Sequence, residues 1–189
     1  MFYTKFFNPT IESIMKITLL FLCFMLAFQG LNGQEPVTRE DFANYNLVEV
    51  NFLPSVVTYG KFTYEFRKEG QLVDSSSVVT VFENDGSLFV GLGKQVTDFL
   101  IKTAEGEEFG IKAIQLSTYN DYPGRRERVE VTGRLNGRAV TEPVELIIST
   151  FEAPGQTYDF SHLEGFDTVD EINIKGEKLE FILECFTYQ

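Results

Sequence analysis

Six side chains able to bind a polar ligand lie together in one short segment. They are Tyr119, Asn120, Asp121, Tyr122, Arg125 and Arg126. Tyrosine rings can stack on the C–H faces of sugars, and amide, carboxylate and guanidinium groups can hydrogen-bond to hydroxyl groups. Binding residues concentrate on loops carried by a rigid scaffold. The segment predicts a ligand-binding loop, and the alternative reading is a polar turn built on Pro123-Gly124.

Four acidic residues closer to the C-terminus could supply the oxygen ligands that calcium prefers. They are Asp159, Asp167, Asp170 and Glu171. A calcium site among them is one expectation, and a solvated acidic rim is the other. Zinc is not expected, because the chain has one histidine and two cysteines. We predict no other cofactor.

The sequence offers few residues that could catalyse hydrolysis. His162, the one histidine, is adjacent to Ser161, but sequence neighbours do not make a triad, and the chain has no Gly-x-Ser-x-Gly motif. Retaining jelly-roll glucanases carry alternating acids on one strand, whereas the nearest stretch here, 171–175, has Asn173 in the middle and Lys175 at the end. We therefore predict that the protein is not an enzyme. A hydrolase whose two carboxylates converge in a cleft is a third hypothesis.

The acidic composition limits the classes of partner. The formal net charge is −12, and an acidic surface repels phosphate backbones and anionic lipids. Nucleic-acid binding is therefore not expected. Beyond residue 33 the chain keeps a single cysteine, Cys185, so no internal disulfide is expected there. Cys185 is predicted to be buried on the apolar side of the last strand, with Leu179, Phe181 and Leu183.

Residues 15–33 have the layout of a secretory signal peptide. Lys16 precedes an apolar run over 17–28, and small and polar residues follow. The run is shorter than the roughly 20 residues that span a bilayer, so no membrane span is expected after cleavage near Gly33. Met15 is the preferred start, with a longer leader from Met1 or an uncleaved anchor as alternatives. The sequence predicts a protein that is secreted, on the cell surface or periplasmic.

The remainder, 34–189, alternates between apolar and polar residues in short segments separated by turns, a pattern typical of strands. The predicted strands are 46–53, 61–67, 77–82, 87–90, 96–102, 109–117, 128–132, 144–148, 171–175 and 179–188. The pair Asn136-Gly137 predicts a two-residue hairpin turn. The best helical candidate is one turn around 39–45. We expect a single all-β domain, a two-sheet β-sandwich of jelly-roll type.

Three motifs lie in the second half of the chain: 109–116, Val-x-Val-x-Gly-x-x-Asn-Gly over 129–137, and Gly-Phe-x-x-Val-Asp over 165–170. On these motifs the chain resembles galactose-binding-like and carbohydrate-binding jelly-roll modules of secreted and surface proteins of bacteria. The resemblance implies a non-catalytic module for glycan binding or cell adhesion. A structural or protein-partner-binding extracellular protein without a glycan site is the alternative, because this architecture hosts many roles.

Overall fold

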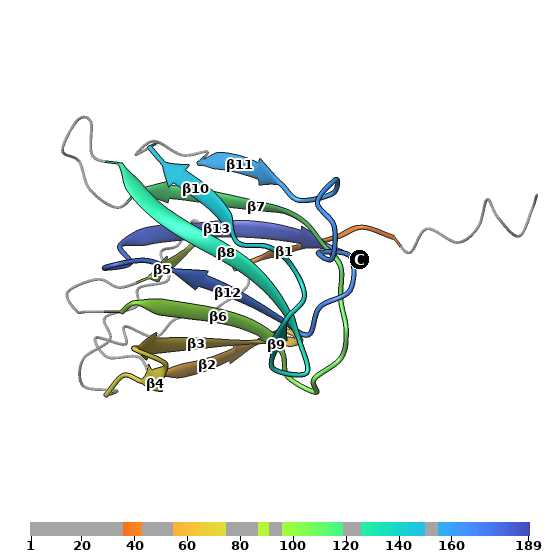
Figure 1. Ribbon diagram of the computed structural model, residues 1–189, viewed down its shortest axis with the longest axis horizontal. Coiled ribbons are helices and arrows are strands. Elements are labelled where there is room, and N and C mark those ends of the chain that lie inside the picture. The colour runs from red at the N-terminus through yellow and green to blue at the C-terminus, as the bar shows by residue number, and fades with distance from the viewer. Residues whose placement is uncertain (1–35, 43–54, 75–86, 91–95, 119–125, 150–154) are drawn as a thin grey trace, which may run out of the picture. The chain divides into compact units, whose positions relative to one another are not determined.

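The computed structural model describes residues 36–42, 55–74, 87–90, 96–118, 126–149 and 155–189, and the regular structure in these ranges is all β-strand (Figure 1). The predicted leader 1–33, the predicted strands 46–53 and 77–82, and most of the predicted binding loop lie outside the described residues. None of the described residues forms a helix that is long and apolar enough to cross a membrane. Residues Val37–Gln189 group into one compact unit.

Two antiparallel sheets pack face to face, which confirms the predicted β-sandwich. The five-stranded small sheet contains β1 (Thr38–Asp41), β5 (Leu88–Val90), β7 (Ile111–Thr118), β11 (Gln156–Asp159) and β13 (Phe181–Tyr188). The eight-stranded large sheet contains β2 (Val56–Tyr59), β3 (Phe62–Lys68), β4 (Gln71–Leu72), β6 (Asp98–Thr103), β8 (Glu127–Leu135), β9 (Arg138–Ala139), β10 (Val144–Ile148) and β12 (Glu171–Lys175).

Eight of these strands have the connectivity of a jelly roll. From β5 onward the chain crosses repeatedly from one sheet to the other, giving the order β5-β13-β7-β11 in the small sheet and β6-β12-β8-β10 in the large one. The first strand of this set therefore pairs with the last, and the second with the second-last, as in a double-sheet jelly roll. The strands β2 and β3 extend the large sheet beyond β6, and β1 pairs with the second half of β13.

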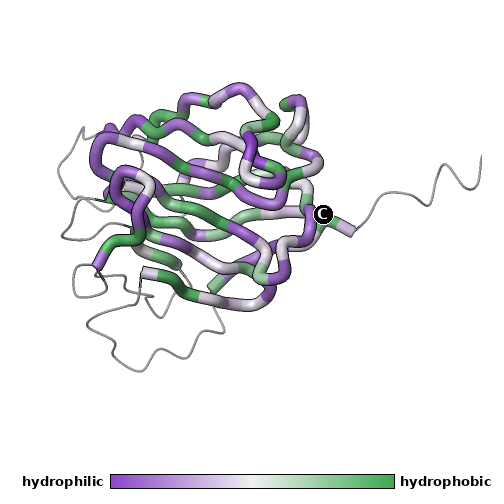
Figure 2. Tube along the Cα trace, turned by 60° about the horizontal axis from the view of Figure 1, so that its bottom comes forward, coloured by the Kyte–Doolittle hydropathy of each residue, from purple (hydrophilic) through white to green (hydrophobic). Residues whose placement is uncertain are grey.

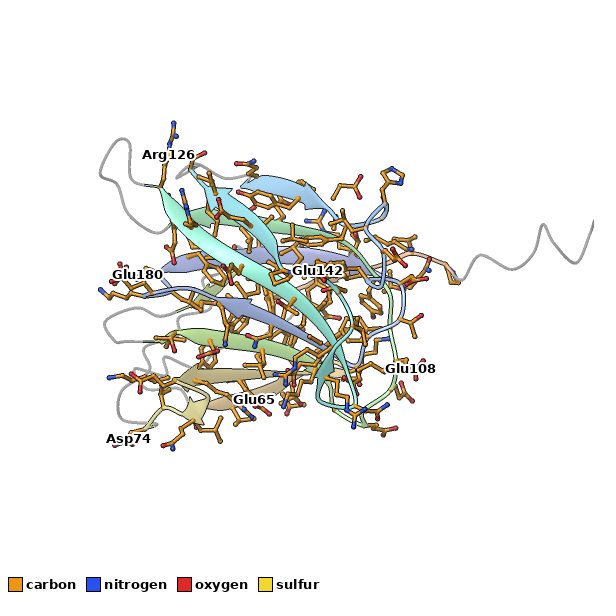
Figure 3. The ribbon with its side chains drawn as sticks, viewed as in Figure 1. Glu65, Asp74, Glu108, Arg126, Glu142 and Glu180 are labelled. Carbon is orange, nitrogen blue, oxygen red and sulfur yellow. The ribbon has the colours of Figure 1, made fainter. Side chains whose placement is uncertain are left out.

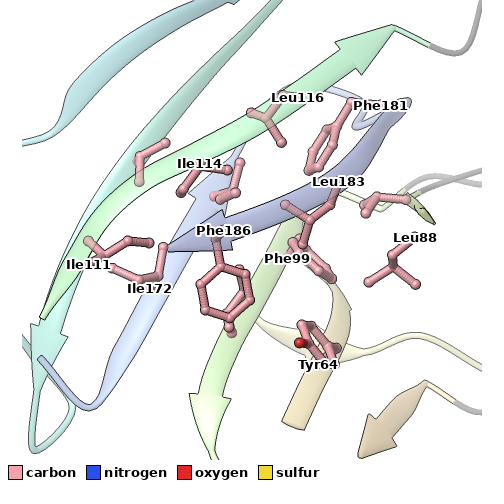
Figure 4. Packing of buried hydrophobic residues seen from close by; sticks show 14 of the residues in the cluster. Tyr64, Leu88, Phe99, Ile111, Ile114, Leu116, Ile172, Phe181, Leu183 and Phe186 are labelled. Carbon is pink, nitrogen blue, oxygen red and sulfur yellow. The ribbon is translucent and has the colours of Figure 1, made fainter. Parts of the chain in front are cut away.

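The core lies between the two sheets, because each strand places alternate apolar side chains on one face. Figure 2 shows this alternation along the strands, and Figure 4 shows the packed side chains. Phe62, Tyr64 and Phe66 point inward from β3, within the predicted strand 61–67, and all three are fully buried. Aromatic rings join the sheets: the centroid of Phe62 on β3 lies 4.8 Å from that of Phe186 on β13.

The predicted hairpin at Asn136-Gly137 is confirmed. Both residues have positive φ, 52° and 75°, and the turn joins β8 to β9. Gly133, in the same motif, allows the returning chain to approach, since its N–H donates to the Thr141 hydroxyl (2.9 Å). A Cβ at position 133 would lie 2.8 Å from methyl groups of Thr141 and Val169. These motif residues have a structural role.

Two local predictions are wrong. Residues 39–41 belong to β1 and not to a helical turn, because this polar segment is held by backbone pairing with 185–187 of β13. Cys185 is buried, but it does not share the face of Phe181 and Leu183. The pairing of β13 with β7 shifts register between Leu183 and Cys185, and the Cys185 thiol instead contacts Gln115 Oε1 at 3.3 Å. Burial raises the pKa of the Cys185 thiol.

Candidate functional site

A charged groove with a volume of about 1050 Å³ lies at one end of the large sheet. Its lining comprises Lys68, Glu69, Thr97, Asp98, Arg126, Glu127, Arg128, Glu130, Lys175, Gly176, Glu177 and Lys178. Five of these residues are Lys or Arg and five are Asp or Glu, so the formal charges of the lining balance. The chain has only 16 Lys and Arg against 28 Asp and Glu, so cations are enriched here.

The groove forms where the ends of β3, β6, β8 and β12 meet. Thr97 ties three of these ends together. Its hydroxyl accepts a hydrogen bond from the Glu69 N–H (2.8 Å) and donates one to Oδ2 of Asp98 (2.7 Å). Its backbone N–H donates to the Arg67 carbonyl (2.9 Å), and its carbonyl accepts from the Gly176 N–H (3.0 Å). The wall of the groove is therefore fixed by hydrogen bonds between neighbouring strand ends.

The turn between β12 and β13 is held against β8 in a similar way. The Glu180 N–H donates to Oε1 of Glu127 (2.6 Å), whose side chain points inward from the first residue of β8. Figure 3 shows Arg126 and Glu180 at the same end of the sandwich. This contact places the residues of the turn, 176–178, opposite Arg126.

Three cations of the groove are paired with carboxylates, and one of them is Lys178, whose Nζ forms an ion pair with Oε1 of Glu180. The other two are Lys175 and Arg128. Lys175 Nζ lies 3.5 Å from Oδ1 of the buried Asp98, and Arg128 Nη1 lies 3.5 Å from Oε2 of Glu145. Arg126 is exposed, and no ion-pair or hydrogen-bond partner for it occurs within the described ranges. Its guanidinium offers five N–H donors to a ligand, which makes Arg126 the cation of the groove best placed to bind one.

A ladder of ion pairs continues from the groove across the outer face of the large sheet. Arg67 Nε donates to Glu65 Oε2 (2.9 Å), and Lys102 Nζ donates to Glu65 Oε1 (3.0 Å). Lys102 also lies 3.3 Å from Glu171 Oε2, and Arg134 Nη1 lies 3.2 Å from Glu171 Oε1. The mostly buried carboxylates of Glu65 and Glu171 thus have two cationic neighbours each. These neighbours offset the unfavourable desolvation of the two charges.

The structure describes one of the six predicted ligand-binding residues, Arg126, and places it in the groove. The other five, Tyr119, Asn120, Asp121, Tyr122 and Arg125, lie outside the described residues, and the prediction for them stays a prediction. In sequence they directly precede Arg126 and connect β7 to β8. The loop predicted from sequence therefore ends at the groove found in the structure.

The four predicted calcium ligands have separate neighbours. Oδ2 of Asp170 accepts a hydrogen bond from the Asn136 N–H (2.7 Å), the carboxylate of Glu171 lies between Lys102 and Arg134, and Asp167 is exposed. Within the described part of the chain, no three His, Cys, Asp or Glu side chains form a group that could hold a metal ion. The calcium hypothesis stays a prediction.

The fourth acid, Asp159, is engaged in a local turn. Its Oδ1 accepts hydrogen bonds from the hydroxyl (2.6 Å) and the backbone N–H (2.8 Å) of Ser161. These two bonds hold the pKa of Asp159 below its usual range, and the neighbouring His162 lowers it further. Because Ser161 donates its hydroxyl to Asp159, and His162 is exposed in a turn, the serine, histidine and aspartate here are arranged as a turn and not as a catalytic triad.

Replacing Ser161 by Ala is expected to raise the pKa of Asp159 toward its ordinary value, because the larger of the two hydrogen-bond contributions disappears. A depressed carboxyl pKa stabilises the fold at pH values above the unfolded pKa, and this contribution is lost as the pH falls through the folded pKa. NMR titration of the Asp159 carboxyl carbon measures the shift. Ser161→Thr keeps the hydroxyl and is the control. An unchanged pKa in Ser161→Ala would rule out the hydroxyl as its main cause.

Sequence reasoning missed the rest of the groove, because its residues come from four separate strand ends and charged residues at strand ends are common on any surface.

Sequence reasoning also missed the role of Glu184. Both carboxylate oxygens of Glu184 accept from the Gly155 N–H (2.8 and 2.9 Å), and Oε1 accepts from the Ser117 hydroxyl (2.9 Å). Glu184 therefore anchors the chain that enters β11.

Comparison of the sequence with protein families and with curated proteins gives no match.

Proposed function

We propose that this chain is a secreted or surface-associated, non-catalytic β-sandwich that binds a glycan in the charged groove. The observation that carries the proposal is the balanced lining of the groove, five cationic and five acidic residues in a strongly acidic chain. A sugar hydroxyl both donates and accepts hydrogen bonds, so it matches a surface that presents carboxylate acceptors beside ammonium and guanidinium donors.

The adjoining loop supports the same ligand class. Carbohydrate sites commonly combine polar groups with an aromatic face, and the groove lining contains no aromatic residue among its described members. Tyr119 and Tyr122 stand a few residues before Arg126 in the sequence. In this proposal, the loop supplies the stacking surface and the groove supplies the hydrogen bonds. The signal peptide predicted over 15–33 supports export to the outside of the cell, where glycans are displayed.

A non-catalytic role is supported by the use of the two buried carboxylates among the five acidic residues of the groove. Asp98 is buried against Lys175 and the Thr97 hydroxyl, and Glu127 holds the Glu180 N–H. Both therefore serve to fix the walls. A glycosidase needs one carboxyl group that is kept protonated and a second that is placed across the bond to be cleaved.

The first test is a glycan-array screen of the purified chain, in calcium and in chelator. We expect saturable binding to at least one neutral glycan, with no cleavage product released from it. Binding that disappears in chelator would support the calcium hypothesis. A blank array with folded protein would contradict the proposal and favour the structural or protein-partner role, and a released product would favour the hydrolase.

The double variant Tyr119→Ala, Tyr122→Ala is expected to abolish glycan binding while leaving the thermal unfolding midpoint nearly unchanged, because both residues stand in the predicted loop between β7 and β8. Binding to the array hit is measured by calorimetry, and stability by thermal unfolding. Unaltered binding would remove the loop from the site.

Arg126→Ala is expected to weaken binding about tenfold or more, because hydrogen bonds from a charged group contribute about 1.5–3 kcal/mol. Arg138→Ala is the matched control, since Arg138 is also exposed but lies on β9, outside the groove. Equal losses in the two variants would indicate a general charge effect and not a contact in the groove.

A further inference from the structure

The groove holds an excess of negative charge once its ion pairs are followed to their partners. Lys175 pairs with Asp98, which also belongs to the lining. The other two paired cations have Glu145 and Glu180 as partners, and these two acids lie outside the lining. Because the formal charges of the lining balance, the groove taken together with these two partners carries two more negative charges than positive ones.

The accessible charges without a partner are mostly negative as well. Three exposed acidic residues of the lining are Glu69, Glu130 and Glu177, and within the described ranges no ion pair or hydrogen bond engages their carboxylates. Among the described cations of the lining, Arg126 alone is in the same condition, because three others are paired and Lys68 also has an interaction. A ligand that enters the groove therefore meets three accessible carboxylates and one accessible guanidinium.

The fold does not require the carboxylate of Glu69. Glu69 and Gly70 form the two-residue turn between β3 and β4, and the φ of Glu69 is 50°. Asparagine and glycine are the residues preferred in such a turn, and glutamate is not. The turn is held to its neighbour by the backbone N–H of Glu69, which donates to the Thr97 hydroxyl, and any residue but proline supplies this group. The glutamate side chain is therefore open to a role in the groove.

The two kinds of free group together indicate the ligand chemistry. A purely cationic ligand fits poorly, because the Arg126 guanidinium repels it. A hydroxyl group fits well, since it accepts hydrogen bonds from a guanidinium and donates them to carboxylates. An ammonium group donates charge-assisted hydrogen bonds to free carboxylates. A sugar that carries both hydroxyl and ammonium groups matches the whole set.

We infer that the glycan bound in the groove carries free amino groups, as a de-N-acetylated hexosamine polymer does, and that Glu69, Glu130 and Glu177 select it over neutral and acidic glycans. This inference rests on the proposed function and adds the ligand class. The free carboxylates attract ammonium groups and repel the carboxylates or sulfates of acidic glycans. The net charge of the chain, −12, acts in the same direction over a longer range.

The test measures binding of three tetrasaccharides to the unmodified chain by calorimetry: tetramers of glucosamine, N-acetylglucosamine and galacturonic acid. We expect the glucosamine tetramer to bind about tenfold more tightly than the N-acetylated one at low salt, because several exposed ion pairs each add a small contribution. This preference should shrink as salt is added, since exposed charges are screened. The galacturonic acid tetramer should bind most weakly of the three.

The double variant Glu69→Asn, Glu177→Gln is expected to lose most of the preference for the glucosamine tetramer while it still binds the N-acetylated tetramer. Both replacements remove a charge but keep a side-chain oxygen that accepts hydrogen bonds from hydroxyl groups. Asparagine suits the turn at position 69, and Glu177 is exposed, so the thermal unfolding midpoint should not fall.

The matched control is the double variant Glu105→Gln, Glu108→Gln, which removes the same charge from two exposed residues between β6 and β7. Glu108 lies at the end of the sandwich opposite Arg126 and Glu180 (Figure 3). The control should therefore keep the preference for the glucosamine tetramer. An equal loss in the control would assign the preference to the overall charge of the chain and would overturn the inference.

Three other outcomes would also overturn the inference. Equal affinity of the unmodified chain for the two hexosamine tetramers would do so while leaving the proposed function intact, and so would a preference that persists in the groove variant. Tighter binding of tetralysine than of the glucosamine tetramer would show that the groove takes a basic peptide. If none of the tetramers binds and the glycan array is also blank, the inference and the proposed function both fail.

Discussion

Phe62→Ala is expected to lower the free energy of unfolding by about 3–5 kcal/mol, because the truncation leaves a cavity at a point where the two sheets meet. The Phe62 side chain is fully buried on β3. Its ring centroid lies 5.3 Å from that of Phe109, 4.8 Å from Phe186 and 4.9 Å from Tyr188, all in edge-on contacts. The variant loses three favourable ring pairs as well as buried apolar area.

Urea unfolding followed by fluorescence and circular dichroism measures this loss. The control is Thr63→Ala, which changes the next residue on the opposite face, where the Thr63 hydroxyl only pairs with that of Thr58 (3.2 Å). We expect the control to lose less than about 1 kcal/mol. If Phe62→Ala also loses less than about 1 kcal/mol of unfolding free energy, the aromatic cluster does not hold the two sheets together.

The core of the sandwich could be predicted, because apolar and polar residues alternate clearly in each strand that has one apolar face. Phe62 and Ile174 belong to such strands, β3 and β12. The edge strands could not be predicted in the same way. The sequence of β1, Thr-Arg-Glu-Asp, is entirely polar and becomes a strand only because β13 offers it an unpaired edge. Strand β11, at the other edge of the small sheet, has a single large apolar group in Tyr158. Tertiary pairing decides such segments.

The candidate site was predictable only in part, for a related reason. Arg126 belongs to a run of predicted ligand-binding residues that are adjacent in sequence, so composition alone indicates it. Asp98 and Lys175 come from distant segments, and only the pairing of β6 with β12 brings them together.

Gly110→Ala is expected to destabilise the protein by about 3 kcal/mol, the upper part of the range for overpacking, because the added methyl group meets backbone and not a movable side chain. A Cβ at position 110 would lie 2.7 Å from the Asp167 carbonyl oxygen. Hydrogen bonds fix the two segments on either side of this contact. Phe109 and Val169 exchange N–H···O bonds of 2.7 and 2.9 Å, and the Ile111 N–H donates to the Phe166 carbonyl (2.8 Å).

Gly133→Ala is the informative comparison for Gly110→Ala. At position 133 a Cβ also meets atoms at 2.8 Å, but these are side-chain methyl groups of Thr141 and Val169 and not backbone. Since neither Gly110 nor Gly133 has positive φ, alanine can adopt the backbone conformation at both sites, and the neighbouring atoms alone set the difference. Urea unfolding should therefore rank Gly110→Ala below Gly133→Ala in stability. The reverse order would show that the 165–170 segment can move away from β7 when a methyl group is added at position 110.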